Sequence, residues 1–170
     1  GTGEEHIKHI ARKVIEQKGD RVYTFTRERI KWHKEQGHIV IAISGSPLEL
    51  VKEMSEKYHM DDYRGTIYKL DENGKYNGEV VPMWDSDSKQ KAINELVEKH
   101  DIDLSKSYAY GDTSGDYTMF KSVGCPFAIN PTKELLGKIK NDESLKDKIN
   151  LIVERKDVTY KLDMNSIEII

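Results

Sequence analysis

The sequence predicts an α/β fold in which a parallel sheet is flanked by helices. The segment HIVIAIS at 38–44 is an apolar run of the kind found where both faces of a strand are covered. Two shorter apolar runs, at 108–110 and 125–129, are each followed by a polar turn and a segment with helical spacing. Strands that alternate with helices in this way pair in parallel through helical crossovers. A chain of 170 residues is expected to form one main domain with its own core.

Two helices are expected before the first strand. Residues 4–18 place apolar side chains at helical spacing with charges on the opposite face, and Gly19 is the expected stop. A second helix at 27–36 has a weaker apolar face and ends at Gly37. Neither helix carries an obvious catalytic group, and their histidines are predicted to be solvated surface residues: His6, His9 and His33.

The first strand ends in Ser44-Gly45-Ser46, where a helix is expected to begin at once. Ser46 is the predicted N-cap, Pro47 the first helical residue, and Glu49 the residue that completes a capping box. Ser44 would then lie at a strand end, before a helix N-terminus whose free N–H groups and dipole favour an anion. The alternative is a well-capped strand-to-helix turn with no ligand.

A β-hairpin is expected after this unit. Residues 64–70 and 75–81 are extended runs around an Asp-Glu-Asn-Gly sequence, and Asn-Gly is typical of hairpin turns. Such a hairpin is an insertion in the otherwise alternating pattern of strands and helices.

The next helix, at 88–100, contains a lysine on its apolar stripe. Lys89, Ile93 and Leu96 are spaced so that they share the face expected to meet the core. A lysine in a first helical turn is also unfavourable beside the positive end of the helix dipole. Lys89 either extends along the rim of the core into solvent or points into a crevice to hold an anion. Its position favours the second interpretation.

Two carboxylates follow the central strand, in the segment SYAYGDTSGDYTMF. Asp112 comes directly after the strand at 108–110, at the sheet edge where open α/β folds bind ligands. Asp116 lies in the first turn of the next helix and can face the same crevice. Two carboxylates at a strand end suggest a Mg²⁺ site, because Mg²⁺ prefers oxygen ligands and few protein groups. The alternative is a solubilising turn in which Ser114 caps the helix.

The C-terminal part continues the alternation of helices and strands but contains no candidate site residue. A helix beginning at Asn130-Pro131 places apolar residues on one side, and the polar stretch 140–148 is expected to be a solvated helix end or loop. Residues 151–153 and 158–162 are predicted to form short edge strands.

Composition and charge argue against a nucleic-acid-binding, a membrane or a disulfide-bonded protein. The net charge of −3 is spread along the chain without a basic stripe, so nucleic acid is not an expected partner. The single cysteine, Cys125, excludes an internal disulfide and suits a reducing compartment. The sequence has no long apolar run and no signal-peptide core at its start, so neither a membrane span nor a membrane partner is expected. A cytoplasmic protein is the default expectation.

Three motifs in this order resemble the haloacid dehalogenase (HAD) superfamily, in the branch that includes phosphoserine phosphatase. Ser44 in IAISGSP resembles the residue that hydrogen-bonds the substrate phosphate, with the backbone at Gly45. Lys89 in DSDSKQKAI resembles the lysine that neutralises the phosphate and the aspartyl nucleophile. In GDTSGD, the resemblance implies that Asp112 binds Mg²⁺ and that Asp116 assists at the metal site.

The resemblance also implies an architecture. It covers residues 39–131 and predicts a Rossmann-like parallel sheet with flanking helices and a β-hairpin insertion. Residues 1–36 are then expected to be the remnant of a helical cap, and 37–170 the α/β core of that family.

One motif of the family does not have a counterpart here. An Asp-x-Asp at the end of an opening strand should supply the nucleophile and the general acid, but Asp20 is the only aspartate before Ser44. The pairs in 85–87 and 101–103 have the spacing but do not follow an apolar strand. The chain is therefore a fragment, or the nucleophile strand comes from elsewhere, or the chemistry has been lost.

For a protein that has the missing segment, the resemblance implies Mg²⁺-dependent hydrolysis of a small phosphorylated metabolite through an aspartyl-phosphate intermediate. Phosphoserine and other small phosphomonoesters are equal candidates. The alternative is a catalytically silent module of the same fold that binds Mg²⁺ or phosphate. An unrelated nucleotide-binding domain is disfavoured, because the chain has no GxGxxG or GxxxxGK[ST] loop.

Overall fold

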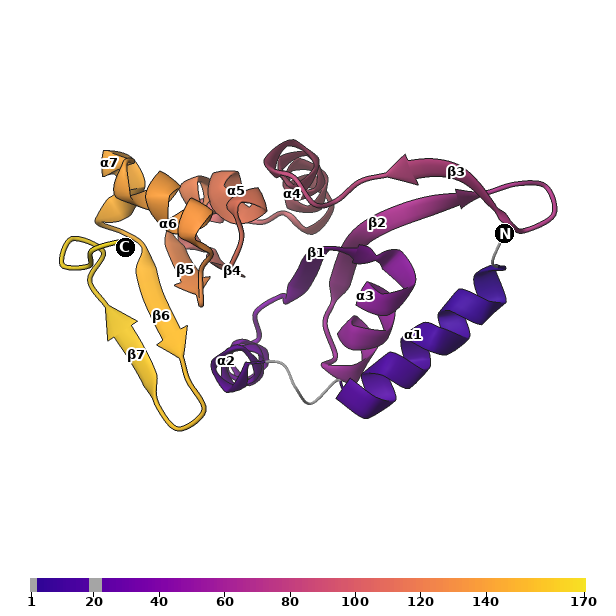
Figure 1. The fold of residues 1–170 in the computed structure, drawn as a ribbon, viewed down its shortest axis with the longest axis horizontal. Helices are drawn as coiled ribbons and strands as arrows, with labels where there is room; N and C mark the ends of the chain where they lie inside the picture. Colours follow the sequence, from indigo (N-terminus) through magenta and orange to yellow (C-terminus); the bar gives the residue numbers. More distant parts are fainter. Residues whose placement is uncertain (1–2, 19–22) are drawn as a thin grey trace. The chain divides into compact units, whose positions relative to one another are not determined.

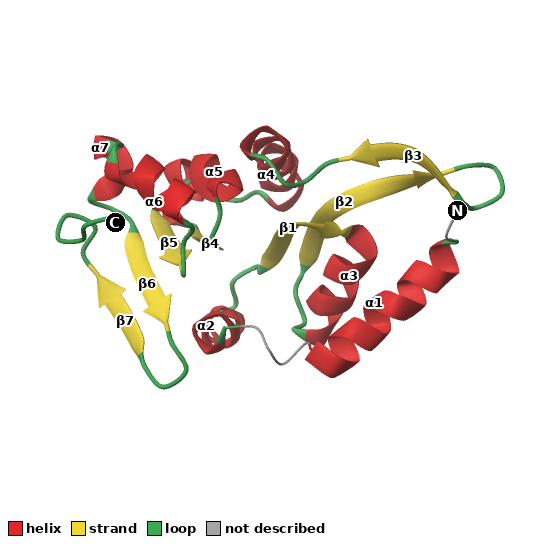
Figure 2. Ribbon diagram, in the orientation of Figure 1, coloured by secondary structure: helices red, strands yellow, loops and turns green. Residues whose placement is uncertain are grey.

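A computed structural model describes residues 3–18 and 23–170 (Figure 1). The chain divides into two compact units, Gly1–Trp84 and Asp85–Ile170. Both contain strands paired in parallel and flanking helices (Figure 2), which confirms the predicted α/β class. The expected division of the chain at residue 36 remains a prediction. Gly19 and Asp20 lie outside the described residues.

The first unit places two helices beside a three-stranded sheet. The helix α1 (Glu4–Lys18) has the bounds that the apolar spacing predicted, and it lies along α3 (Leu48–Lys57), which packs on the sheet (Figure 1). Ala11 of α1 and Val51 of α3 are among the buried side chains of this unit. The helix α2 (Thr24–Glu35) begins slightly earlier than expected.

Strand β1 (Ile41–Pro47) runs further than the sequence predicted. It includes Ser46 and Pro47, so Ser46 is not the N-cap of α3 and Pro47 is not its first helical residue. Pro47 itself holds the N-cap position with extended torsion angles, because it pairs with strand β2 opposite Thr66. The predicted capping box is therefore wrong. Glu49 Oε2 is instead buried without a hydrogen-bond partner among the described residues.

Strand β2 (Asp62–Leu70) has two partners. Its first part pairs in parallel with β1, with Ala42 opposite Tyr63. Its second part forms the predicted hairpin with β3 (Tyr76–Val81), with Ile67 opposite Val81. Gly74 adopts a φ of 71° in the hairpin turn, a left-handed conformation that glycine reaches without strain. The segment predicted as an insertion is thus also a member of the parallel sheet.

Two interactions join the end of α2 to the segment that leads into β1. His33 is only 7% exposed, and its Nδ1 lies 2.9 Å from Nδ1 of His38. Lys34 Nζ lies 3.0 Å from Asp61 Oδ1, and Asp61 Oδ2 accepts a 2.7 Å hydrogen bond from the Val40 N–H. The prediction that His33 is a solvated surface residue is wrong, because the chain turns back after α2 and brings the second imidazole onto it.

The burial of His33 makes the stability of this unit depend on pH. Burial, with smaller contributions from the positive charges of Arg29 and His38, lowers the pKa of His33 from 6.5 to about 4. Because the unfolded chain then binds more protons than the folded one between these two values, the free energy of unfolding should fall as the pH falls from about 6.5 to about 4.

Urea unfolding at pH 7 and pH 4.5 would measure this effect. The variant His33→Gln should lose less stability over that range than the wild type, while His100→Gln, in a different helix, should behave like the wild type. Equal losses in the wild type and in His33→Gln would contradict the assignment.

The second unit contains a four-stranded sheet in the order β4-β5-β6-β7. The first three strands are parallel and the last is antiparallel; their bounds are Tyr108–Gly111, Cys125–Ile129, Asn150–Glu154 and Thr159–Leu162. The prediction that both C-terminal strands are edge strands is half wrong. β7 lies at the edge, but β6 lies between β5 and β7, and its Leu151 and Ile152 are buried.

Helices pack around the core of this unit, which includes Phe120, Leu135 and Ile139. Their bounds are Ser86–His100 for α4, Tyr117–Ser122 for α5, Lys133–Lys140 for α6 and Glu143–Lys146 for α7, with 3₁₀ turns η2 (Leu104–Lys106) and η3 (Ser114–Asp116). The polar stretch expected to be solvated contains α7, whose Leu145 is fully buried. In residues 3–18 and 23–170, no helix is long and apolar enough to cross a bilayer.

Candidate functional site

The second unit holds a buried ion pair between α4 and the turn after β4. Lys89 is 6% exposed, and its Nζ lies 2.6 Å from Oδ1 of Asp116, which is 4% exposed. The predicted stripe on α4 is confirmed, since Ile93 and Leu96 are also buried. Lys89 therefore does not extend into solvent along the rim of the core. Its ammonium group ends on a carboxylate.

The second oxygen of Asp116 anchors the turn itself. Asp116 Oδ2 accepts hydrogen bonds from the N–H groups of Asp112, at 3.1 Å, and Thr113, at 3.2 Å. Gly111 has to be a glycine, because a Cβ atom there would collide with the Asp116 carboxylate. One side chain thus fixes both the lysine and the backbone that carries Asp112.

Asp112 directly follows β4, as predicted, and remains accessible to solvent. Its carbonyl oxygen accepts a 2.9 Å hydrogen bond from the Thr132 N–H, which ties the turn to the start of α6. Partial burial and the negative charge of Asp116 raise the pKa of the Asp112 carboxyl, and the positive charge of Lys89 opposes this. A cation beside Asp112 would therefore favour its ionised form.

The donor set fits a hard divalent cation in part. Both oxygens of Asp116 are engaged by protein groups, so Asp112 is the carboxylate of the pair better placed to act as a ligand. No group of three or more His, Cys, Asp or Glu side chains suited to a metal ion occurs in the described part of the chain. Mg²⁺ does not need such a group, because it keeps several waters and binds through one or two carboxylates and substrate phosphate oxygens.

Ser44 and Gly45 belong to the first unit, so the structure does not place them with the other three predicted site residues. The Ser46 N–H donates to Ser44 Oγ at 3.2 Å, and the carbonyl oxygen of Gly45 accepts a 2.8 Å hydrogen bond from Thr66 Oγ1. A Cβ atom on Gly45 would lie 2.9 Å from the Cβ of Trp84, so this position also requires glycine. The sequence contained no signal that pointed to Thr66.

Two Asp-x-Asp pairs that lacked the context of a nucleophile motif have a structural role. Asp85 caps α4 by accepting a 2.7 Å hydrogen bond from the Ser88 N–H, and Asp103 caps η2 through the Ser105 N–H at 3.0 Å. Hydrogen bonds from Ser88 and Ser105 lower the pKa of the respective aspartates. Asp85 and Asp103 thus stabilise the starts of α4 and η2.

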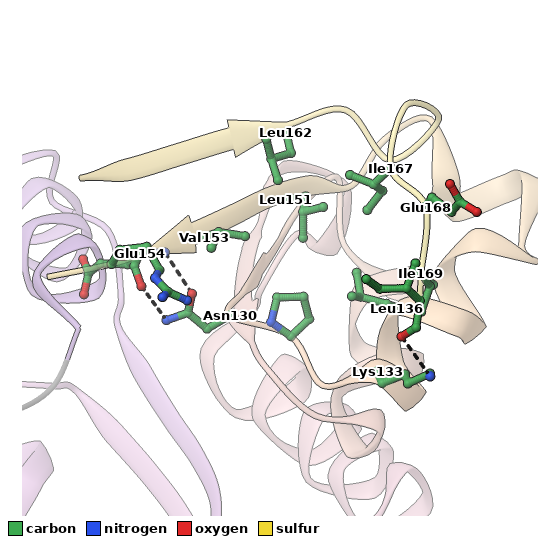
Figure 3. A pocket seen from close by; sticks show the side chains of 13 residues that line it. Asn130, Lys133, Leu136, Leu151, Val153, Glu154, Leu162, Ile167, Glu168 and Ile169 are labelled. Atoms are coloured by element: carbon green, nitrogen blue, oxygen red, sulfur yellow. Dashed lines mark hydrogen bonds between the residues drawn. The ribbon is translucent and has the colours of Figure 1, made fainter. Parts of the chain in front are cut away.

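The second unit also has an open pocket of about 540 Å³ (Figure 3). Apolar side chains of β6, β7 and the C-terminal segment line it, including Leu151, Leu162 and Ile167. At its rim, the Asn130 side chain exchanges two hydrogen bonds with the backbone of Glu154 (Figure 3). None of the predicted site residues contributes to this pocket.

The sequence of this chain matches the model of a known protein family. The model for haloacid dehalogenase-like hydrolases matches residues 2–121, which is most of the chain and includes every predicted site residue.

Curated relatives agree with this match. The chain is 31% identical to the "Inhibition of morphological differentiation protein" of Streptomyces azureus, over 79% of this chain and 49% of that protein. It is 26% identical to a phosphoserine phosphatase of Methanocaldococcus jannaschii, over 77% of this chain and 57% of that protein. The chain spans about half the length of the curated relatives it matches.

Solved structures share the fold. A substrate-bound phosphoserine phosphatase superposes with a TM-score of 0.57 at 25% identity, over 77% of this chain and 58% of that one. A phospho-aspartyl intermediate analogue of phosphoserine phosphatase superposes with a TM-score of 0.61 at 22% identity, over 91% of this chain and 73% of that one. The predicted parallel sheet with flanking helices is therefore the fold of these phosphatases.

Proposed function

Because the chain belongs to the haloacid dehalogenase-like hydrolase family, we propose that the protein is a Mg²⁺-dependent phosphomonoester hydrolase of the phosphoserine-phosphatase type. The observation that carries this proposal is the buried contact between Lys89 and Asp116, which also anchors the turn that bears Asp112. Burying an ammonium group costs free energy unless the group is paired. A buried and paired lysine therefore suits a site that needs a positive charge in a fixed position.

In this proposal, Lys89 neutralises the charge of the transferring phosphoryl group and of the nucleophile. Asp116 takes one of the three N–H donors of the ammonium group, which leaves two for the nucleophile and the substrate phosphate. Asp116 serves mainly to orient Lys89 and the turn, because both of its oxygens are already bonded within the protein. Phosphoryl transfer depends on this kind of positioning and charge stabilisation.

Asp112 would hold Mg²⁺, which when bound neutralises charge on the phosphoryl oxygens. Ser44 and the backbone at Gly45 would bind the substrate phosphate. The nucleophile would be an aspartate on a segment other than residues 1–170, since no Asp-x-Asp at a strand end precedes Ser44. Its attack on phosphorus would form an aspartyl-phosphate and release the alcohol, and water would then release inorganic phosphate.

The substrate proposed is a small phosphorylated metabolite in the cytoplasm, with phosphoserine as the first candidate. Two curated relatives named as phosphoserine phosphatases, from Mycobacterium tuberculosis and M. jannaschii, support that choice. The second candidate function is a silent module that binds Mg²⁺ or phosphate without hydrolysis. The similarity to phosphoserine phosphatases does not favour this alternative.

Phosphate release from a panel of phosphomonoesters, with and without Mg²⁺, tests the proposal in the whole protein. The intact mass should be measured first. A mass near 19.6 kDa means that the protein is this chain alone, and phosphate binding without turnover is then expected. A larger mass with Mg²⁺-dependent release of phosphate supports the hydrolase. A larger protein that releases phosphate from no member of the panel would refute it.

A further inference from the structure

Strand β1 bulges away from its partner at the predicted phosphate-binding residues. Ile43 pairs with Arg64 and Pro47 pairs with Thr66, so three residues of β1 (44–46) stand opposite the single residue Gly65 of β2. A bulge removes backbone groups from the sheet ladder and can aim them at a ligand. These groups must find other partners where they are buried.

The carbonyl group of Gly45 finds its partner in a buried hydroxyl. Thr66 is fully buried, and its Oγ1 donates to the Gly45 oxygen at 2.8 Å. The same Oγ1 accepts a 3.2 Å hydrogen bond from the Met83 N–H. Thr66 therefore uses its hydroxyl as donor and acceptor at once, and joins the bulge to the segment at the end of the first unit.

The next peptide group transmits this restraint to Ser44. The C=O of Gly45 and the N–H of Ser46 belong to one trans peptide, so they point in opposite directions. With the carbonyl held by Thr66, the N–H is directed to the other side, where it donates to Ser44 Oγ at 3.2 Å. Since that hydroxyl accepts this bond, its own proton remains available for a further acceptor.

Close packing limits the freedom of the bulge on two sides. A Cβ atom on Gly45 would meet the Cβ of Trp84 at 2.9 Å, and a Cβ atom on Gly65 would meet the Cα of Leu48 at 2.8 Å. The bulge thus lies directly against the backbone of its neighbours, and the Thr66 hydrogen bond selects the orientation of its peptide within that space.

We propose that Thr66 is a positioning residue of the phosphate subsite: its buried hydroxyl holds the Gly45 carbonyl, so that the Ser46 N–H is directed onto Ser44 Oγ and the Ser44 hydroxyl proton is left to bind a phosphate oxygen. This inference rests on the proposed function, in which Ser44 binds the substrate phosphate. Thr66 has no exposed surface and acts through the Gly45–Ser46 peptide, not by contact with the substrate.

Binding of inorganic phosphate to the whole protein, measured by titration calorimetry, tests the inference without requiring turnover. Thr66→Val keeps the shape of the side chain and removes both hydrogen bonds, and it should weaken phosphate binding about tenfold, the size of a lost hydrogen bond. Thr66→Ser keeps the hydroxyl and should restore binding to within about twofold of the wild type. The control is Ser55→Ala, which removes another buried hydroxyl of the same unit that has no hydrogen-bond partner among the described residues.

A double-mutant cycle with Ser44→Ala distinguishes a positioning role of Thr66 from a loss of stability. If Thr66 acts through Ser44 and its neighbour, adding Thr66→Val to Ser44→Ala should weaken binding much less than Thr66→Val does alone. Fully additive effects would mean that Thr66 only stabilises the unit, and would overturn the inference.

NMR of the Ser46 amide tests the inference even if Thr66→Val does not fold, because it uses the wild type and Thr66→Ser. In the wild type and in Thr66→Ser, phosphate should shift the Ser46 amide resonance; an unshifted resonance in a phosphate-bound wild type would overturn the inference. Wild-type binding of phosphate with no change in Thr66→Val would also overturn it while leaving the proposed function intact. A wild type that neither binds phosphate nor hydrolyses phosphomonoesters would refute both.

Discussion

Replacing Lys89 with alanine in the whole protein is expected to lower turnover by about two to four orders of magnitude, the range for removing a group that stabilises charge in the transition state. Lys89 is the cation that the structure holds in a fixed position next to the turn carrying Asp112, through its 2.6 Å contact with Asp116. Turnover of phosphoserine or of the best substrate in the panel measures the effect. Lys91→Ala, an exposed lysine on the same helix, should leave the rate unchanged.

The same substitution should destabilise the protein, because it leaves the Asp116 carboxylate buried without its partner. Breaking a buried pair on one side costs about 3–5 kcal/mol. The double variant Lys89→Ala/Asp116→Asn removes that charge and should recover part of the stability without recovering the activity. A folded Lys89→Ala protein with a nearly normal rate would contradict the proposed role of the lysine.

Asp112→Asn should lower the activity of the protein without lowering its stability. Turnover is expected to fall by about two to four orders of magnitude, because an amide is a poor substitute for the proposed Mg²⁺ ligand. Stability should be unchanged or should rise, because burial and the charge of Asp116 raise the pKa of Asp112, which means that its ionised form is disfavoured in the fold.

Turnover at increasing Mg²⁺ and thermal unfolding without Mg²⁺ measure the two effects of Asp112→Asn. Asp157→Asn, in an exposed turn of the second unit, is the control for loss of one negative charge. A normal rate in Asp112→Asn would refute its role, and so would a loss of activity fully explained by unfolding.

Local sequence patterns predicted the position of the turn that carries Asp112 and Asp116 in the second unit. Asp112 follows a strand as expected, and the spacing of Lys89 with Ile93 and Leu96 correctly placed the lysine on a buried helix face. These predictions succeeded because strand ends and helix faces are set by neighbouring residues in the chain. The direct contact between Lys89 and Asp116 was harder to predict, because the two residues are distant in sequence.

The first unit shows where sequence patterns were not sufficient. Ser46 and Pro47 have the residue types of a helix start, but both belong to β1, and Pro47 pairs with Thr66 of β2. The prediction of a surface position for His33 is wrong, because the turn after α2 brings His38 against it and no local pattern marks that turn. Thr66 has no motif, and its role arises only from the meeting of β1, β2 and the segment at Met83.

The change of partners along β2 divides the first unit into parts that can open separately. Beside β1 the strand is buried at Gly65 and Thr66 and partly buried before them, whereas residues 67–69 are exposed, and from Ile67 on the strand pairs with β3. Local opening of the hairpin therefore exposes little apolar surface and should cost far less free energy than opening of the strand before it. Fraying from Gly74, or a longer turn at that position, would end at Thr66 and leave the Gly45 carbonyl in place. The hairpin is thus free to vary in length and sequence without altering the bulge at Ser44.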